Sequence, residues 1–214
     1  MKFVLDTTAI TDSELREREH FESICESANE ILNLIAVASV KLNVECYIPY
    51  PSVYNELIGF LKRNNCSEEI LIKLDTWLIK KTPNRYEIKI PAIILYEYVI
   101  SVRQKMNKSR RLAEDFIWES SAVTMSSNDV KAEIGNLISK FRDRYRTTVR
   151  QGIIDSPSDL DVLLLAKELN AGVVSSDIGI KSWSERFGLR FIEAAKFPKI
   201  LREMIRRSEY YEHR

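Results

Sequence analysis

Short apolar segments alternate with helical patterns along most of this 214-residue chain, and this alternation restricts the fold more than any other feature. Each apolar segment is strand-sized, and most are followed by a stretch with helical periodicity. We expect strands at 2–6, 45–50, 172–175 and 190–192, with a strand or extended connector at 85–90. Helices are expected at 52–63, 67–80, 157–169, 178–187 and from residue 194, with another after residue 11. Strands that alternate with helices indicate a parallel sheet of the α/β class.

A long helical stretch at 91–150 interrupts the alternation. Apolar residues recur there at three- and four-residue steps up to about Ser120, and again from Val130 to Val149 after a polar turn. The pattern predicts a helical hairpin inserted into a core made of 1–90 and 151–214. Residues 101–150 carry 11 Lys and Arg against 6 Asp and Glu, whereas 1–100 carry 11 against 15 and 151–214 carry 10 against 10. A confined basic segment is typical of nucleic-acid binding, although a solvated basic helix has the same sequence pattern.

The composition argues against several classes of protein. No apolar run reaches the roughly 18 residues of a membrane span, and the N-terminal residues have no signal-peptide pattern, so no membrane partner is expected. Cys25, Cys46 and Cys66 are widely spaced and form no Cys-x-x-Cys pair. This spacing argues against a zinc ribbon and a disulfide framework, and it favours the reducing cytoplasm. Because only His20 and His213 are present, we expect chemistry that does not depend on histidine.

Acidic residues follow the predicted strands. Asp6 ends the first strand, Glu56 lies one turn into the helix after the second, and Asp177 directly follows the strand at 172–175. Three more acids lie near the start of the helix at 157–169, namely Asp155, Asp159 and Asp161. Asp155 and Asp159 share a helix face if that turn is helical, whereas Asp161 is rotated away from them. Ligands of open parallel sheets bind outside the carboxyl ends of the strands, so these acids are candidates for one site.

Carboxylates that converge on one crevice repel each other, and a hard divalent cation removes that repulsion. We therefore expect a Mg²⁺ or Mn²⁺ site, where two ions can activate a water and stabilise the leaving oxygen during phosphodiester hydrolysis. Each acid also has a structural interpretation: Asp155 as a helix cap, Asp159 as a partner of the helix dipole, Asp6 as a turn residue and Glu56 as a solvated helix residue. Independent caps need not all fall at one edge of one sheet, which favours the metal site.

Arginines form a row on the second helix of the hairpin, opposite its apolar stripe. Arg142, Arg146 and Arg150 are spaced four residues apart, and such a row can follow a phosphate backbone. A second cluster on the first helix comprises Arg103, Lys105, Lys108, Arg110 and Arg111. Either cluster could instead be a solvated face. Apolar stripes on both helices exceed what one hairpin buries, which predicts a homo-oligomer formed through the insertion.

The order of the acids resembles that of PIN-type nucleases: Asp6 in Phe-Val-Leu-Asp-Thr-Thr, an acid after the second strand, a central aspartate cluster, and Ser-Ser-Asp near the end. Longer segments resemble one branch, the family once called RNA ligase partner proteins and now grouped with the protein-only ribonuclease P enzymes known as HARP. These segments are Phe3–Leu15, Tyr47–Leu57 with Ile-Pro-Tyr-Pro-Ser-Val-Tyr, Leu74–Ile90 with Lys-Thr-Pro-Asn-Arg-Tyr, and Gly152–Leu169 with Leu-Asp-Val-Leu-Leu-Leu-Ala-Lys-Glu-Leu.

The resemblance implies a PIN-like α/β fold and RNA-free removal of the 5′ leader from precursor tRNA with Mg²⁺ or Mn²⁺. It also implies a homo-oligomer formed through the insertion, and tRNA contacts by Arg142 and Arg146. The implied metal-site residues are Asp6, Asp155, Asp159, Asp161 and Asp177. Two alternatives are a PIN ribonuclease with another RNA target, such as a toxin-like enzyme, and a non-catalytic RNA-binding partner protein. Toxin-type chains are generally shorter and lack the hairpin, and the full acid set argues against a non-catalytic protein.

Overall fold

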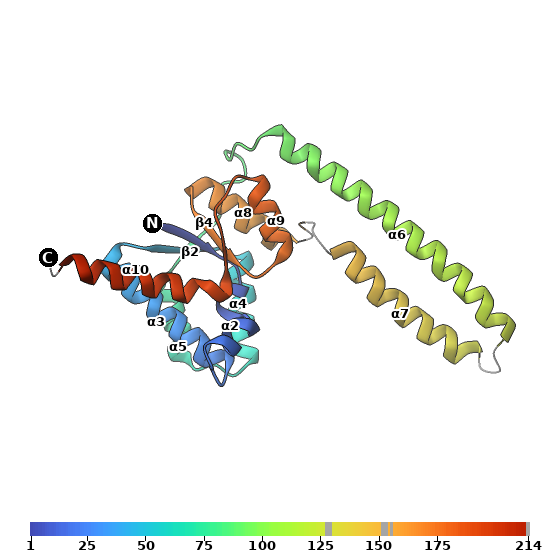
Figure 1. The fold of residues 1–214 in the computed structure, drawn as a ribbon, viewed down its shortest axis with the longest axis horizontal. Helices are drawn as coiled ribbons and strands as arrows, with labels where there is room; N and C mark the ends of the chain where they lie inside the picture. The colour runs from blue at the N-terminus through green and yellow to red at the C-terminus, as the bar shows by residue number, and fades with distance from the viewer. Residues whose placement is uncertain (127–129, 151–153, 155, 213–214) are drawn as a thin grey trace. The chain divides into compact units, whose positions relative to one another are not determined.

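The computed structural model describes residues 1–126, 130–150, 154 and 156–212. The chain divides into two compact units: a core unit of Met1–Lys89 with Ser156–Arg214, and an insertion unit of Ile90–Asp155. The predicted insertion is 91–150. Figure 1 shows the order of the elements along the chain.

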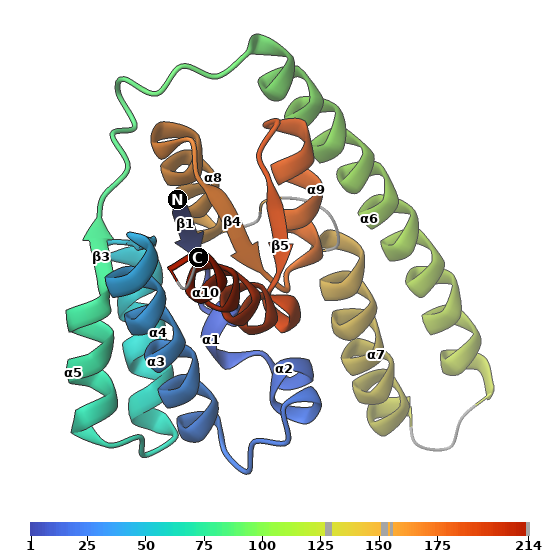
Figure 2. The same cartoon turned by 60° about the vertical axis from the view of Figure 1, so that its left-hand side comes forward.

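A five-stranded parallel sheet forms the centre of the core unit, in the order β3-β2-β1-β4-β5. The strands are β1 (Lys2–Leu5), β2 (Glu45–Pro49), β3 (Leu78–Lys81), β4 (Gly172–Ser175) and β5 (Phe191–Glu193). The predicted α/β fold with a parallel sheet is confirmed. The strand order reverses at β1, because β2 pairs with one side of it and β4 with the other. Figure 2 shows β4 and β5 following β1 on one side. A reversal of this kind opens a crevice at the carboxyl ends of the two central strands.

Helices of the core unit connect these strands and cover the sheet. They are α1 (Thr8–Thr11), α2 (Ser13–Arg18), α3 (Ile24–Leu42), α4 (Ser52–Arg63), α5 (Glu68–Trp77), α8 (Pro157–Leu169), α9 (Ile178–Arg186) and α10 (Phe197–Glu212), with a 3₁₀ turn, η1, at Ala194–Lys196. Helix α3 packs against α5 and α10, and α8 packs against α4 and α9. Phe3, Ile35, Leu57, Trp183 and Phe197 are almost completely buried, so one apolar core joins the sheet to its helices.

One sequence-based boundary is wrong. The helix expected at 67–80 ends at Trp77, and Leu78–Lys81 forms the edge strand β3, whereas 85–90 is not a strand. The physical reason is tertiary pairing: the backbone of 78–81 pairs with β2, and Leu78 is buried opposite Cys46. Burial against a neighbouring strand overrides the local helical pattern.

The expectation of no disulfide is also wrong, because Cys25 and Cys66 are bonded, with their Cα atoms 5.2 Å apart. The fold brings the first turn of α3 next to the α4–α5 connection, and a separation of 41 residues does not reveal this proximity. The argument from cysteine spacing for a reducing compartment therefore loses its basis. Cys46 is free and buried, and desolvation raises the pKa of its thiol to about 12.

The insertion unit consists of two long helices, α6 (Ala92–Ser126) and α7 (Val130–Arg150), which pack against each other. The ring of Phe116 meets that of Phe141 edge-on, with centroids 5.2 Å apart. Lys105 Nζ donates a hydrogen bond to the carbonyl oxygen of Thr148 at 2.8 Å, and desolvation lowers the pKa of this lysine. Within the described residues of both units, no helix is long and apolar enough to cross a membrane.

Candidate active site

Asp6 lies at the carboxyl end of the central strand β1 and is only 8% exposed. Its backbone N–H donates to the carbonyl oxygen of Val174 at 3.0 Å, which joins it to β4. Its side-chain Oδ2 accepts hydrogen bonds from Thr8 Oγ1 at 2.6 Å and Ser175 Oγ at 2.8 Å. The Asp6 carboxylate is therefore oriented by hydroxyl groups at the point where the strand order reverses.

The Ser-Ser-Asp segment after β4 extends this network. Ser176 N–H donates to Thr8 Oγ1 at 2.9 Å, and the Asp177 N–H donates to Ser175 Oγ at 3.0 Å. Asp177 also caps α9, because its Oδ1 accepts from the Ile180 N–H at 2.9 Å. Asp177 thus combines a structural function with a position beside the Asp6 network.

Glu56 lies on α4 and interacts electrostatically with Asp6. Partial burial raises the pKa of the Glu56 carboxyl, the negative charge of Asp6 raises it further, and Arg63 opposes both effects. Two acids from different elements therefore repel each other at the same edge of the sheet. A bound cation would relieve this repulsion.

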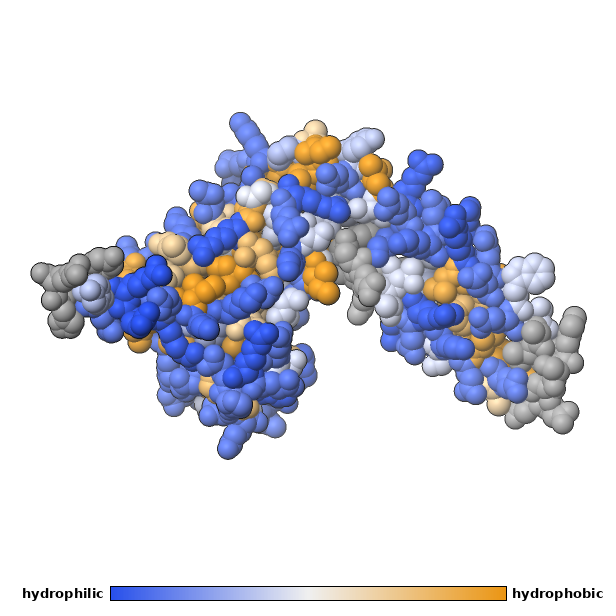
Figure 3. All heavy atoms as spheres, in the orientation of Figure 1, coloured by the Kyte–Doolittle hydropathy of each residue, from blue (hydrophilic) through white to orange (hydrophobic). Residues whose placement is uncertain are grey.

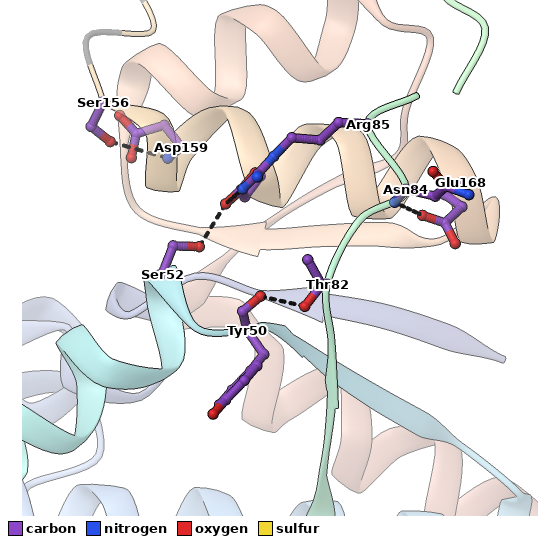
Figure 4. Close-up of polar contacts among 9 residues, drawn as sticks. Tyr50, Ser52, Thr82, Asn84, Arg85, Ser156, Asp159 and Glu168 are labelled. Carbon is purple, nitrogen blue, oxygen red and sulfur yellow. Dashed lines mark hydrogen bonds and ion pairs between the residues drawn. The ribbon is translucent and has the colours of Figure 1, made fainter. Parts of the chain in front are cut away.

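The amino end of α8 carries the next predicted acids. Ser156 is the N-cap of α8, and its Oγ accepts a hydrogen bond from the Asp159 N–H at 3.1 Å (Figure 4). Asp159 is half-buried in the first turn, where a carboxylate interacts favourably with the helix dipole. The structural interpretation of Asp155 as the cap is wrong, because Ser156 occupies that position. Asp155 itself lies outside the described residues.

Asp161 has a different environment from the other acids. It is 1% exposed, and Arg85 binds its carboxylate with Nε at 2.9 Å and Nη2 at 2.7 Å from Oδ1. Arg85 Nη2 also lies 2.7 Å from Oδ2, which accepts a further hydrogen bond from Ser52 Oγ at 2.7 Å. Both oxygens of Asp161 are therefore engaged by protein donors.

The segment that carries Arg85 passes beside α8 (Figure 4). Thr82 Oγ1 donates to the carbonyl oxygen of Tyr50 at 2.8 Å, and the Asn84 N–H donates to Glu168 Oε2 at 2.8 Å. These contacts attach the Lys-Thr-Pro-Asn-Arg-Tyr motif to the residue that follows β2 and to α8. The sequence did not predict that this motif positions Arg85 beside Asp161. It also did not predict the hydrogen bonds of Thr8 and Ser175 to Asp6, or that of Ser52 to Asp161.

The described residues contain no group of three or more His, Cys, Asp or Glu close enough to hold a metal ion. That description does not include Asp155. The groups that converge on the edge are carboxylate and hydroxyl oxygens from Asp6, Glu56, Thr8 and Ser175. Such hard donors, with two mutually repelling carboxylates, fit Mg²⁺ or Mn²⁺ better than a soft metal.

The predicted RNA-binding arginines lie on the insertion unit. Arg142 and Arg146 are exposed on α7, and Arg111 is exposed on α6. Arg110 is exposed as well, and its Nε lies 3.6 Å from Glu114 Oε1 on the following turn. The side chain of Arg150 lies outside the described part of the chain.

The parallel sheet, its order and the buried aspartate at the end of the central strand define a PIN-type ribonuclease. A family model described as PINc domain ribonuclease matches residues 2–206. Three relatives named RNA-free ribonuclease P match nearly the whole chain. The protein of Archaeoglobus fulgidus is 68% identical over 208 residues, covering 96% of this chain and 92% of the relative. That of Methanococcus aeolicus is 48% identical over 229 residues, covering 95% of each chain. That of Methanocaldococcus jannaschii is 45% identical over 218 residues, covering 97% and 94%.

The chain belongs to the RNA-free ribonuclease P family and is an endoribonuclease. The predicted resemblance and enzyme class are confirmed.

Proposed function

We propose that this protein removes the 5′ leader from precursor tRNA by hydrolysing one phosphodiester bond with Mg²⁺ or Mn²⁺. The observation that carries the proposal is similarity over nearly the full length to proteins named RNA-free ribonuclease P, together with an oriented aspartate at the strand reversal. The older alternative of a non-catalytic partner protein does not account for this arrangement.

Asp6 is the central residue of the proposed site. Thr8 and Ser175 hold its Oδ2, and within the described residues no hydrogen bond reaches its Oδ1, which leaves this oxygen for a cation. Asp155, Asp159, Asp177 and Glu56 are the further proposed oxygen donors. A divalent ion bound there would activate the attacking water and stabilise the leaving oxygen. Glu56 contributes negative charge beside Asp6 that favours cation binding.

Asp161 differs from this set in its contacts. Because Arg85 and Ser52 engage both of its oxygens, its contacts support a positioning role: it holds Arg85 and the 82–86 segment against α8. The resemblance suggests that Asp161 is a metal-site residue, and the stability experiment in the Discussion separates the two roles.

The insertion unit is the proposed RNA-binding and oligomerisation element. Arg142 and Arg146 are exposed and one turn apart on α7, a spacing that suits phosphate contacts. Arg110, Arg111 and Arg150 are secondary candidates for the same contacts. Apolar side chains are also exposed on the hairpin, with Ile117 67% and Trp118 76% exposed, and Figure 3 shows apolar residues among hydrophilic ones there. Association of copies through this surface would bury them.

The test is cleavage of one end-labelled precursor tRNA by the purified protein with Mg²⁺, with the cut mapped to the nucleotide. We expect one cut at the mature 5′ end and none in EDTA. Asp6→Asn should abolish cleavage and keep RNA affinity, because the arginines are unchanged. Arg142→Ala with Arg146→Ala should instead weaken binding and lower its salt dependence by roughly one unit of slope per phosphate. A cut in the anticodon loop would assign a different RNA target, and full cleavage in EDTA would eliminate the metal mechanism.

A further inference from the structure

A cationic groove lies in the core unit between the end of α2 and the start of α10, with a volume of about 910 Å³. Six basic residues line it, namely Arg18, Lys196, Lys199, Arg202, Arg206 and Arg207. The acidic residues in its lining are Glu19 and Glu203, and two acids beside it, Glu14 and Glu193, pair with Arg18 and Lys196. Six positive charges against four negative charges leave a net charge of +2.

The two acids of the lining order the arginines and neutralise only part of their charge. Glu19 lies 2.8 Å from Arg202, and Glu203 pairs with Arg206 at 2.9 Å and Arg207 at 3.0 Å. One carboxylate thus arranges two guanidinium groups, which stay largely exposed to solvent, at 77% and 73%. Lys199 has no ion pair among the described residues. The groove therefore presents ordered cations with unused hydrogen-bond donors, which is the chemistry that recognises phosphate.

The groove also has an apolar part that suits a nucleic acid better than a small anion. Ala195, Ile200 and Met204 line it between the charged residues. Figure 3 shows hydrophilic residues together with fewer apolar ones over the surface of α10. Lys199, Arg202 and Arg206 recur at three- and four-residue steps, so they follow one face of α10 over about 10 Å. This length corresponds to roughly three phosphates along one strand of a duplex.

The groove is connected to the Asp6 network through α2. Asp12 caps this helix by accepting the Leu15 N–H at 2.7 Å, and its other oxygen accepts the Ser176 hydroxyl. Ser176 in turn binds Thr8, which binds Asp6. Helix α2 has six residues and is therefore about 9 Å long. The groove at its far end is thus separated by about the length of this helix from the Asp12 cap, which contacts the Asp6 network.

We infer that this groove binds the phosphates of the substrate RNA close to the cut. The inference rests on the proposed function, because it assigns part of the same substrate to a second surface of the core unit. The groove is distinct from the arginine row of the insertion unit. It would let the core unit itself contact RNA phosphates near the bond that is cut.

The experiment compares two double variants that each remove two positive charges from the core unit. Lys199→Gln with Arg206→Gln changes the groove. The matched control, Lys2→Gln with Lys62→Gln, changes two exposed lysines at the start of β1 and the end of α4, neither of which lines the groove. Binding of labelled precursor tRNA is measured in EDTA, so that the RNA stays intact, between about 50 and 200 mM salt.

We expect the groove variant to lower the slope of log affinity against log salt by about 1.5, and the control to leave it unchanged. Between about 50 and 200 mM salt, the wild type should lose about eightfold more affinity than the groove variant. Equal slopes for the groove variant and the control would overturn the inference.

Cleavage by the wild type tests the proposed function independently. If the wild type cuts at the mature 5′ end and the groove variant matches the control, only the groove inference fails. If the wild type cuts no precursor tRNA but its binding still depends on the groove, the proposed function fails and the groove remains an RNA-binding surface.

Discussion

Arg85→Ala should destabilise the core unit through the charge that it leaves behind on Asp161. The Asp161 side chain is 2% exposed, and Arg85 is its ionic partner at 2.7 Å. Removing one partner of a buried pair costs about 3 to 5 kcal/mol, because the remaining charge stays buried without compensation. The Arg85 side chain is 54% exposed, so water can partly replace it, and we expect the lower end of that range, about 3 kcal/mol. For a chain of this length, this corresponds to a fall in Tm of roughly 6 to 12 °C.

The double variant, Arg85→Ala with Asp161→Asn, tests the ion pair directly, because the stability costs of the two substitutions are not expected to add. Asp161→Asn alone removes the charge and keeps an acceptor for Ser52, and the half-exposed Arg85 can turn to water, so the cost should be about 1 kcal/mol. In the Arg85→Ala background, the same substitution removes the uncompensated charge and should restore stability. The double variant is therefore expected to be more stable than Arg85→Ala by more than 1 kcal/mol.

Thermal unfolding followed by circular dichroism, at pH 7 and without divalent ions, measures all three variants. Lys89→Ala is the control, because it removes an exposed positive charge from the same connection and should change stability by less than about 0.5 kcal/mol. Additive costs, or an Arg85→Ala protein as stable as the control, would refute the ion-pair argument. If Asp161→Asn also abolished the rise in Tm caused by Mg²⁺, Asp161 would be a metal-site residue and not a positioning residue.

Three further predictions test the site and the fold. Burial and the charge of Asp6 raise the pKa of Glu56, so its contribution favours the folded state below its ordinary pKa and is lost as pH rises through the raised value. Glu56→Gln should therefore raise the free energy of unfolding at pH 7 by less than about 1 kcal/mol, seen as a slightly higher Tm, and reduce the stabilisation by Mg²⁺. Cys66→Ser removes the disulfide between residues 41 positions apart and should lower the free energy of unfolding by about 4 kcal/mol, measured by denaturant unfolding without reductant. Adding Cys25→Ser should lower it no further. His20→Ala should leave the single-turnover rate unchanged from pH 6 to 8, and a loss of rate would show that a histidine takes part.

The parts of the fold that the sequence predicts are those set by local pattern. The strand at 172–175 and the helices at 52–63 and 157–169 have the predicted limits, because buried residues, a proline in the first turn and a polar cap act within a few residues. The position of Asp6 at the reversal of the sheet follows from the same pattern, because parallel strands have their carboxyl ends at one edge. The edge strand β3 was missed because only its neighbour β2 makes it a strand.

The contacts that orient the site could not be predicted, because they join residues far apart in sequence. Ser175 reaches Asp6 across 169 residues, and Arg85 reaches Asp161 across 76. An exposed arginine in a connector and a buried aspartate in a helix give no sign in sequence that they will pair. The Asp-Thr-Thr and Ser-Ser-Asp motifs did carry a usable signal, because hydroxyl groups beside an acid at a strand end are suited to orient its carboxylate.

The charge balance of residues 151–214 does not reveal the cationic groove, because this segment is much longer than the distance over which charges interact. Residues 151–214 balance at 10 against 10, but their acids lie mainly before residue 194 and their bases mainly after it. Residues 196–207 alone carry five Lys and Arg against the single acid Glu203, a net charge of +4. Charge acts over about one Debye length, near 8 Å in physiological salt, on each side of a residue, which together corresponds to about three helical turns and not to 60 residues. A window of about twelve residues is therefore the physically appropriate one, and in this chain it identifies α10 as a second candidate surface for RNA beside the inserted hairpin.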